Sequence, residues 1–126
     1  MSLEYVDNTT IKLLDNKEEN RDILLEFLLE IDGIFPIPLS EKIDLNEYVD
    51  RYLEFALILV AEINSKIIGI NIFYANDFLN YTGHVTIIGI LEKYRDRNLG
   101  TVLIQKSLEI SKNKGMKSID VLVHKS

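Results

Sequence analysis

The chain has 126 residues, of which 47% are hydrophobic and 27% are charged, and a formal net charge of −6, which fits one ordinary globular domain. It has no cysteine, so disulfides, thiolate metal ligands and cysteine nucleophiles are excluded together. Its longest apolar run, residues 55–61, is far shorter than the roughly 20 residues that cross a bilayer, and no signal segment opens the chain. We therefore expect one cytoplasmic domain over residues 1–126.

The first half predicts a short strand and two amphipathic helices. The run at residues 9–14 is typical of a strand. Asn16, with a glutamate three residues on, predicts the start of a helix whose apolar residues recur at helical spacing until Gly33. Asp44 and Glu47 repeat this capping pattern and predict a second helix.

The second half predicts four strands and a third helix. The strands are expected at residues 57–63, 67–75, 83–91 and 118–123, and the helix runs from residue 99 to a C-cap at Gly115. The first two strands are separated by a turn at residues 64–66 and form a hairpin. A strand, a helix and a second strand in succession indicate a parallel crossover. The order β-α-α-β-β-β-α-β thus predicts an α/β fold with a mixed sheet.

Charge divides the chain into an acidic and a basic part. Residues 1–60 carry 14 acidic and 5 basic side chains, whereas residues 61–126 carry 6 acidic and 9 basic ones. This asymmetry suggests an anionic ligand near the C-terminal half and a cationic one near the N-terminal half. Two solvated faces of opposite sign are the alternative.

The most informative segment is the strand-to-helix junction at residues 93–101, which packs three basic side chains into five positions. Unpaired N–H groups and the helix dipole favour phosphate oxygens at such a helix start. Gly100 lets a phosphate approach the backbone, and Asn98 tolerates a left-handed conformation or caps the helix. The junction predicts an anion site, with a basic loop that merely caps the helix as the alternative.

Other catalytic patterns are absent from the sequence. It contains no GxxxxGK[ST], no GxGxxG after a strand and no GxSxG. Its two histidines, His84 and His124, lack the paired spacing of a metal-binding helix, so we expect no metal site.

The segment from Ile87 to Leu103 resembles the acyl-CoA motif of the GNAT superfamily of N-acetyltransferases, [Q/R]-x-x-G-x-[G/A]. Arg95 fills its first position and Gly100 its last, and Tyr94 matches the common preceding tyrosine. Asn98 stands where the family prefers an inner glycine, and asparagine can adopt the same backbone geometry.

This similarity covers most of residues 9–126, including the hairpin that contains Gly69, although Glu92 replaces a common proline. Family members usually continue beyond the strand at residues 118–123 with a helix, which often carries a tyrosine general acid, and two strands. The resemblance therefore implies a GNAT-like fold that is short at its C-terminus. An open strand edge there predicts a homodimer.

The resemblance also implies acetyl-CoA as cosubstrate. Its pyrophosphate would lie on the backbone amides of the junction, with Lys93 supplying further charge, and its pantetheine would pair with the backbone of the preceding strand. The implied cofactor-binding residues are Ile88, Ile90, Arg95, Asp96, Arg97, Asn98, Leu99, Gly100 and Thr101.

The family transfers acetyl by direct attack of a neutral amine, here a primary amine of a small molecule or peptide. The amine would enter near the acidic helices and residues 76–81, and a base or a water chain would take its proton. Strand alternation puts His84 on one face with Thr86, Ile88 and Ile90. Because imidazole is the side chain that most often accepts a proton near neutral pH, His84 is the first candidate base, with Glu62 as the second, although a packing or surface role is the alternative.

Three readings stay open. The first is an N-acetyltransferase, the second is a non-catalytic CoA-binding or assembly module, and the third is a small α/β interaction domain whose loop only caps a helix. None of them predicts a nucleic-acid or membrane partner.

Overall fold

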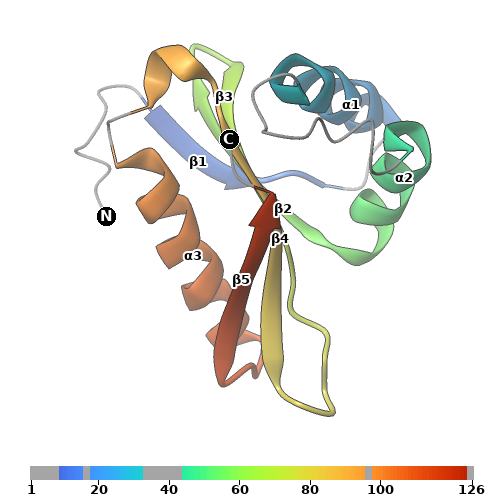
Figure 1. The fold of residues 1–126 in the computed structure, drawn as a ribbon, viewed down its shortest axis with the longest axis vertical. Coiled ribbons are helices and arrows are strands. Elements are labelled where there is room, and N and C mark those ends of the chain that lie inside the picture. The colour runs from blue at the N-terminus through green and yellow to red at the C-terminus, as the bar shows by residue number, and fades with distance from the viewer. Residues whose placement is uncertain (1–8, 16–17, 33–43, 96–97, 125–126) are drawn as a thin grey trace.

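The computed structural model describes residues 9–15, 18–32, 44–95 and 98–124, which form one five-stranded sheet flanked by helices (Figure 1). The elements in chain order are β1 (Thr9–Leu13), α1 (Glu18–Asp32), α2 (Leu45–Phe55), β2 (Leu57–Ile63), β3 (Lys66–Tyr74), β4 (Thr82–Ile90), the 3-10 helix η2 (Glu92–Tyr94), α3 (Leu99–Asn113) and β5 (Ser118–His124). The predicted α/β class and element order are confirmed.

The strands lie side by side in chain order, β1-β2-β3-β4-β5. The first three pairs are antiparallel, and β5 runs parallel to β4 after the crossover through α3. The β2–β3 turn is tighter than expected, because Asn64 and Ser65 both adopt positive φ angles, 51° and 66°. Two such residues match the right-handed twist of the strands, so β3 begins at Lys66 rather than at residue 67.

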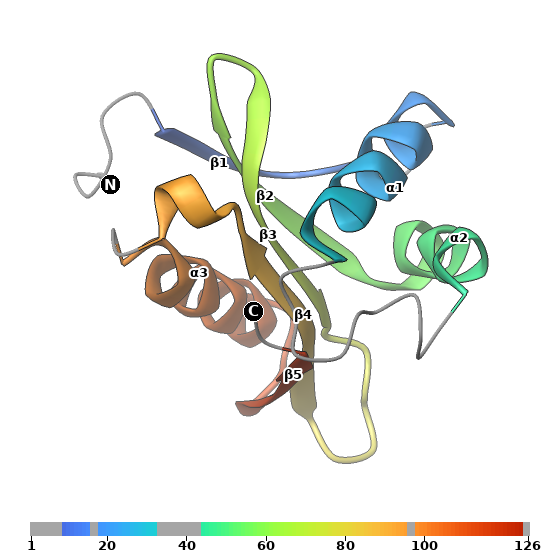
Figure 2. The same cartoon turned by 45° about the horizontal axis from the view of Figure 1, so that its top comes forward.

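Helices cover both faces of the sheet (Figure 2). α1 and α2 pack on one face, where their apolar side chains form a core with the sheet residues Ile58, Val60, Ile70, Ile72 and Ile87. α3 packs on the other face, against a second core that includes Leu59, Ile68, Phe73, Val85 and Ile90. We call these the α1–α2 face and the α3 face.

The predicted cap of the second helix is confirmed. The Asp44 carboxylate accepts hydrogen bonds from the backbone N–H groups of Asn46 (3.0 Å) and Glu47 (3.4 Å), which satisfies two donors that the first helical turn leaves unpaired. The corresponding cap of α1, Asn16, lies outside the described residues.

Close contacts fix α3 against the sheet. A Cβ atom at Gly83 would lie 3.0 Å from Ser111 Oγ. The helix therefore packs so closely on β4 that a side chain at this position would crowd it. Asn71 is fully buried, and its Nδ2 donates a hydrogen bond of 2.9 Å to the carbonyl of Leu103. Because a buried amide must be paired, this bond holds α3 in one position over β3.

A β-bulge interrupts β4. Phe73 pairs with Val85 and Ile72 pairs with Ile87, so Thr86 is the extra residue on the β4 side. An extra residue shifts the alternation of side chains by one position. Side chains before and after Thr86 therefore follow different alternations.

The bulge makes the prediction of a shared face wrong. His84 lies opposite Tyr74, which packs against the α1–α2 core. In contrast, Ile88 and Ile90 contribute to the core on the α3 face. His84 thus lies on the opposite face of the sheet from Ile88 and Ile90, because regular strand alternation does not pass through the bulge at Thr86.

Candidate functional site

The amino end of α3 has an unusual entry. Asn98 precedes the helix with φ 57° and ψ 17°, in the left-handed region, and its side chain makes no capping hydrogen bond. Of the two roles considered for Asn98, shaping the turn is therefore the one observed. Its carbonyl accepts the first helical bond, from the N–H of Val102 (3.1 Å). The N–H groups ahead of Val102 have no intrahelical acceptor, and no hydrogen bond to another described residue occupies them.

The first turn of α3 contains a buried residue, Leu99, followed by a residue with free space beside it, Gly100. The Leu99 side chain is 1% exposed and packs in the core of the α3 face, so only its backbone can face a ligand. At Gly100, a Cβ atom would meet only Ile90 Cδ1, at 3.9 Å. Thr101 is exposed. Gly100 thus leaves room beside the helix start that the fold itself does not need.

Among the described residues, the end of β4 has an edge without a strand partner next to this helix start. The described register between β4 and β5 extends as far as the pair of Ile87 and His124. The N–H of Leu91 points toward β3, where it donates to the Ile68 carbonyl (2.9 Å). Because backbone groups alternate between the two edges of a strand, those of Ile88 and Ile90 point to the β5 side. The backbone groups of Ile88 and the N–H of Ile90 are therefore placed to bond an extended ligand, whereas the Ile90 carbonyl already accepts a hydrogen bond from Arg95.

Arg95 joins this edge to the loop before α3. Its Nε donates a hydrogen bond of 3.3 Å to the carbonyl of Ile90. Its Nη2 is buried and has no hydrogen-bond partner within the described ranges, which is costly for a charged group and leaves a donor for a ligand oxygen. Lys93 beside it is exposed. Asp96 and Arg97, two further predicted cofactor-binding residues, lie outside the described residues.

His84 lies between two carboxylates that the sequence analysis did not single out. Its Nε2 is 3.6 Å from Asp77 Oδ2, and its Nδ1 is 3.6 Å from Asp120 Oδ2. Asp120 is its pairing partner on β5. The imidazole is half-exposed, with 43% of the side chain accessible. Both ring nitrogens therefore face an acceptor on the α1–α2 side of the sheet.

Asp77 organises the loop between β3 and β4. It accepts hydrogen bonds from the backbone N–H groups of Leu79 (3.1 Å) and Asn80 (3.0 Å) and from the Asn80 side chain (3.2 Å). These bonds, chiefly those from Asn80, hold the pKa of Asp77 below its ordinary value, and the contact with His84 acts in the same direction. An aspartate with an asparagine three residues on is a turn signal, so the sequence could have indicated this residue.

The second candidate base, Glu62, is engaged elsewhere. It forms an ion pair of 3.2 Å with Lys12 across β1 and β2, and 17% of its side chain is exposed. It therefore lies two strands away from the open edge of β4.

Two classes of site find no support among the described residues. Within these ranges no group of three histidine, aspartate or glutamate side chains could hold a metal ion. Over the same ranges no helix is long and apolar enough to cross a membrane.

Comparison with known families gives one match, which extends over most of the chain. A model described as "Acetyltransferase (GNAT) family" matches residues 21–126. No curated protein matches the chain significantly.

Solved structures share the fold. A ribosomal-protein-alanine N-acetyltransferase from Brucella melitensis biovar Abortus 2308 superposes with a TM-score of 0.70 at 16% identity, over 91% of this chain and 80% of that one. An aminoglycoside acetyltransferase from an uncultured soil metagenomic sample, in complex with sisomicin, gives 0.67 at 20% identity, over 91% and 77%. An aminoglycoside N-acetyltransferase in complex with CoA gives 0.67 at 14% identity, over 90% and 75%.

Proposed function

Because the chain belongs to the GNAT acetyltransferase family, we propose that it uses acetyl-CoA to acetylate a primary amine. The observation that carries this proposal is that an open strand edge lies beside the start of a helix. The β4 edge at Ile88 and Ile90 is free of β5, and the α3 start beside it presents unpaired N–H groups around Gly100. An extended chain that ends in a pyrophosphate has the chemistry to bind both features at once.

In this proposal the pantetheine arm pairs with the backbone of Ile88 and Ile90 as an additional strand would. The pyrophosphate binds the backbone N–H groups of residues 98–101, and Lys93 adds positive charge nearby. The buried Nη2 of Arg95 supplies a further donor toward the cofactor. A solved neighbour with the same fold contains CoA, which supports acyl-CoA use here.

The proposed chemistry is direct transfer. The lone pair of the amine attacks the thioester carbonyl carbon, the carbon–sulfur bond breaks, and CoA leaves as the thiol after taking up a proton. A backbone N–H near Ile90 stabilises the negative charge that develops on the carbonyl oxygen. The amine loses one proton to a base.

We keep His84 as the proposed base. Its distance from the β4 edge decides whether it takes the proton directly or through water. It lies on the α1–α2 face beside Asp77 of the loop at residues 76–81, which is the side where the acceptor is expected. Ile88 lies four positions further along β4, which is up to about 13 Å at the rise of a strand. The proton would therefore reach His84 through a chain of water molecules.

The acceptor is proposed to be cationic before it loses its proton. α1 carries six acidic residues and one arginine, and that arginine, Arg21, is paired with Asp50 at 2.7 Å. Neighbours with this fold act on aminoglycosides or on a ribosomal-protein alanine, which supports an amine of a small molecule or a peptide.

A non-catalytic CoA-binding module is the second candidate. It is favoured by the bulge at Thr86, which separates His84 from the face of Ile88 and Ile90. Calorimetry with acetyl-CoA and measurement of thiol release over a panel of amines distinguish the two candidates. Binding with amine-dependent thiol release supports the enzyme, whereas binding without any release supports the module.

Self-association and a cytoplasmic location remain predictions. β5 is the last strand of the described sheet, and Val121 on it is 38% exposed. An exposed strand edge pairs readily with another chain, so if β5 is also the edge strand of the complete protein, sedimentation should show a dimer. A monomer at every concentration would contradict this prediction.

A further inference from the structure

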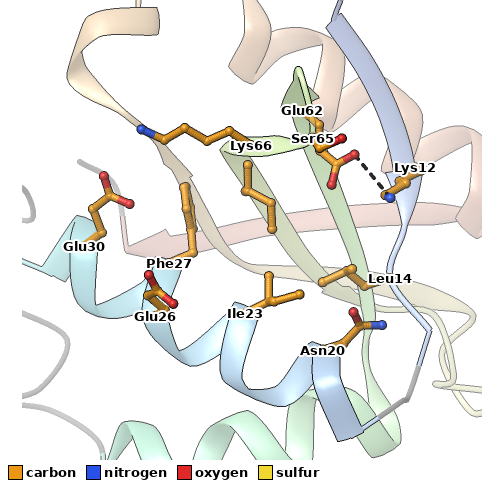
Figure 3. A pocket seen from close by; sticks show the side chains of 11 residues that line it. Lys12, Leu14, Asn20, Ile23, Glu26, Phe27, Glu30, Glu62, Ser65 and Lys66 are labelled. Atoms are coloured by element: carbon orange, nitrogen blue, oxygen red, sulfur yellow. Dashed lines mark ion pairs between the residues drawn. The ribbon is translucent and has the colours of Figure 1, made fainter.

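A pocket of about 270 Å³ lies between α1, β1 and the β2–β3 hairpin, on the α1–α2 face (Figure 3). Its apolar lining comes from Leu14, Ile23, Phe27 and Ile67. Ile23 is 43% exposed although it sits on the helix that packs against the sheet. The pocket therefore leaves apolar surface open to solvent.

The charges around this pocket are unevenly paired. Glu62 is neutralised by Lys12 at 3.2 Å, drawn as the dashed line in Figure 3. Glu26 and Glu30 stand one turn apart on α1 and are exposed, and neither has an ion-pair partner in the part of the chain that the structure describes. Like charges at this spacing repel each other. A cation bound between them would relieve this repulsion.

Lys66 is the remaining charge in the lining. It belongs to the hairpin, and Figure 3 shows its stem running along the side of the pocket opposite α1. A lysine side chain is long and flexible, so its ammonium can turn outward when another cation binds at α1. The two glutamates are short and are fixed to a helix.

We propose that this pocket binds a small organic cation, consisting of a primary ammonium group on a hydrocarbon stem. The ammonium pairs with Glu26 and Glu30, and the stem covers Ile23, Phe27 and Ile67. Burial of the stem against apolar side chains and pairing of the ammonium with the two carboxylates act together. Because both partners are exposed, we expect weak binding of a short alkylammonium.

This pocket is distinct from the proposed acyl-transfer site. Its lining comes from β1, β2 and the start of β3, whereas the open edge of Ile88 and Ile90 faces β5. β3, whose first residues line the pocket, is the direct neighbour of β4, but the pocket opens on the α1–α2 face, whereas Ile88 and Ile90 belong to the core of the α3 face. Binding in this pocket is measured without acetyl-CoA, so the inference is independent of the proposed function.

The test is a titration of n-butylammonium into the full chain without acetyl-CoA, followed by NMR. We expect saturable shifts at Ile23 and Ile67 and weaker binding of neutral n-butanol. The variant Glu26→Gln/Glu30→Gln should lose at least about fivefold in affinity, because both charged partners are removed. The control Glu18→Gln/Glu54→Gln makes the same change in net charge at exposed sites outside the pocket and should bind within about twofold of the parent.

Circular dichroism of both double variants checks that they fold. Shifts concentrated at residues 88–101, absence of saturation, or equal weakening in the two double variants would overturn the proposal. The readout requires no acetyl transfer, so failure of the acetyltransferase proposal leaves it unaffected.

Discussion

The Nε of Arg95 donates a hydrogen bond of 3.3 Å to the main-chain carbonyl of Ile90. This bond ties the loop before α3 to the last residue of β4, at the edge where pairing with β5 has ended. The Nη2 of the same side chain is buried and has no hydrogen-bond partner among the residues that the structure describes. Arg95 therefore connects the β4 edge to the start of α3, the two parts of the proposed cofactor site. Its Nη2 remains available as a hydrogen-bond donor to the cofactor.

Replacing Arg95 with alanine should weaken both the fold and cofactor binding. A hydrogen bond that involves a charged group contributes about 1.5–3 kcal/mol, and removing Arg95 should lower the free energy of unfolding by up to that amount. Acetyl-CoA affinity should fall at least about tenfold, because the helix start is no longer fixed against β4. Urea unfolding and calorimetry measure the two effects. Unchanged affinity in a folded variant would show that Arg95 has no part in the cofactor site.

Gly100→Val should abolish acetyl-CoA binding and leave the fold intact. A Cβ at this position meets only Ile90 Cδ1, at 3.9 Å, so the apo protein can accommodate a side chain that blocks a phosphate from the backbone. The control is Lys112→Ala, in the last turn of α3, which should bind normally. Equal acetyl-CoA affinity of Gly100→Val and the parent would contradict the assignment of the pyrophosphate site to the start of α3.

Asn98→Gly should keep or improve acetyl-CoA binding. The residue adopts φ 57° and makes no side-chain cap, and glycine enters this conformation without steric strain. Asn98→Ala should instead cost about 1 kcal/mol of stability, since a left-handed residue with a Cβ is strained. If calorimetry shows a large loss of affinity in Asn98→Gly, the asparagine side chain itself contacts the ligand.

The sequence was sufficient for features that depend on local chemistry. The cap at Asp44, the left-handed Asn98 and the order of elements follow from residue types and spacing, and all three are observed. The bulge at Thr86 depends on how β4 pairs with β3, which no local pattern encodes. For that reason the shared face of His84 and Ile88 was predicted wrongly. The turn of Arg95 toward Ile90 likewise depends on tertiary geometry.

His84→Ala tests the proposed base. General base catalysis contributes about 10²- to 10⁴-fold, so the rate of transfer should fall within this range while acetyl-CoA affinity stays unchanged. His84→Gln is the matched variant, because it keeps a polar side chain between Asp77 and Asp120. Normal transfer rates in both variants would assign His84 to packing of the β3–β4 loop.

The lowered pKa of Asp77 predicts that the free energy of unfolding decreases in acid. Its pKa is lowered in the folded chain, chiefly by hydrogen bonds from Asn80, so its stabilisation is complete above the ordinary carboxyl pKa of about 3.9. That stabilisation disappears as the pH falls through the lower, folded-state pKa. In urea unfolding at a series of pH values, Asp77→Asn should be less stable than the parent at pH 6, and the gap should narrow below about pH 4. Glu54→Gln, which removes an exposed carboxylate on α2, should show no such convergence.

The central claim is that the chain binds acetyl-CoA at the α3 start and passes the acetyl group to an amine. The most direct measurement follows thiol release from acetyl-CoA by the parent and by Gly100→Val, with and without a panel of primary amines, and detects acetylated amine by mass spectrometry. We expect release and product only with the parent and only when a suitable amine is present. Product formation by folded Gly100→Val at the parent rate would contradict it, as would failure of the parent to bind acetyl-CoA in calorimetry.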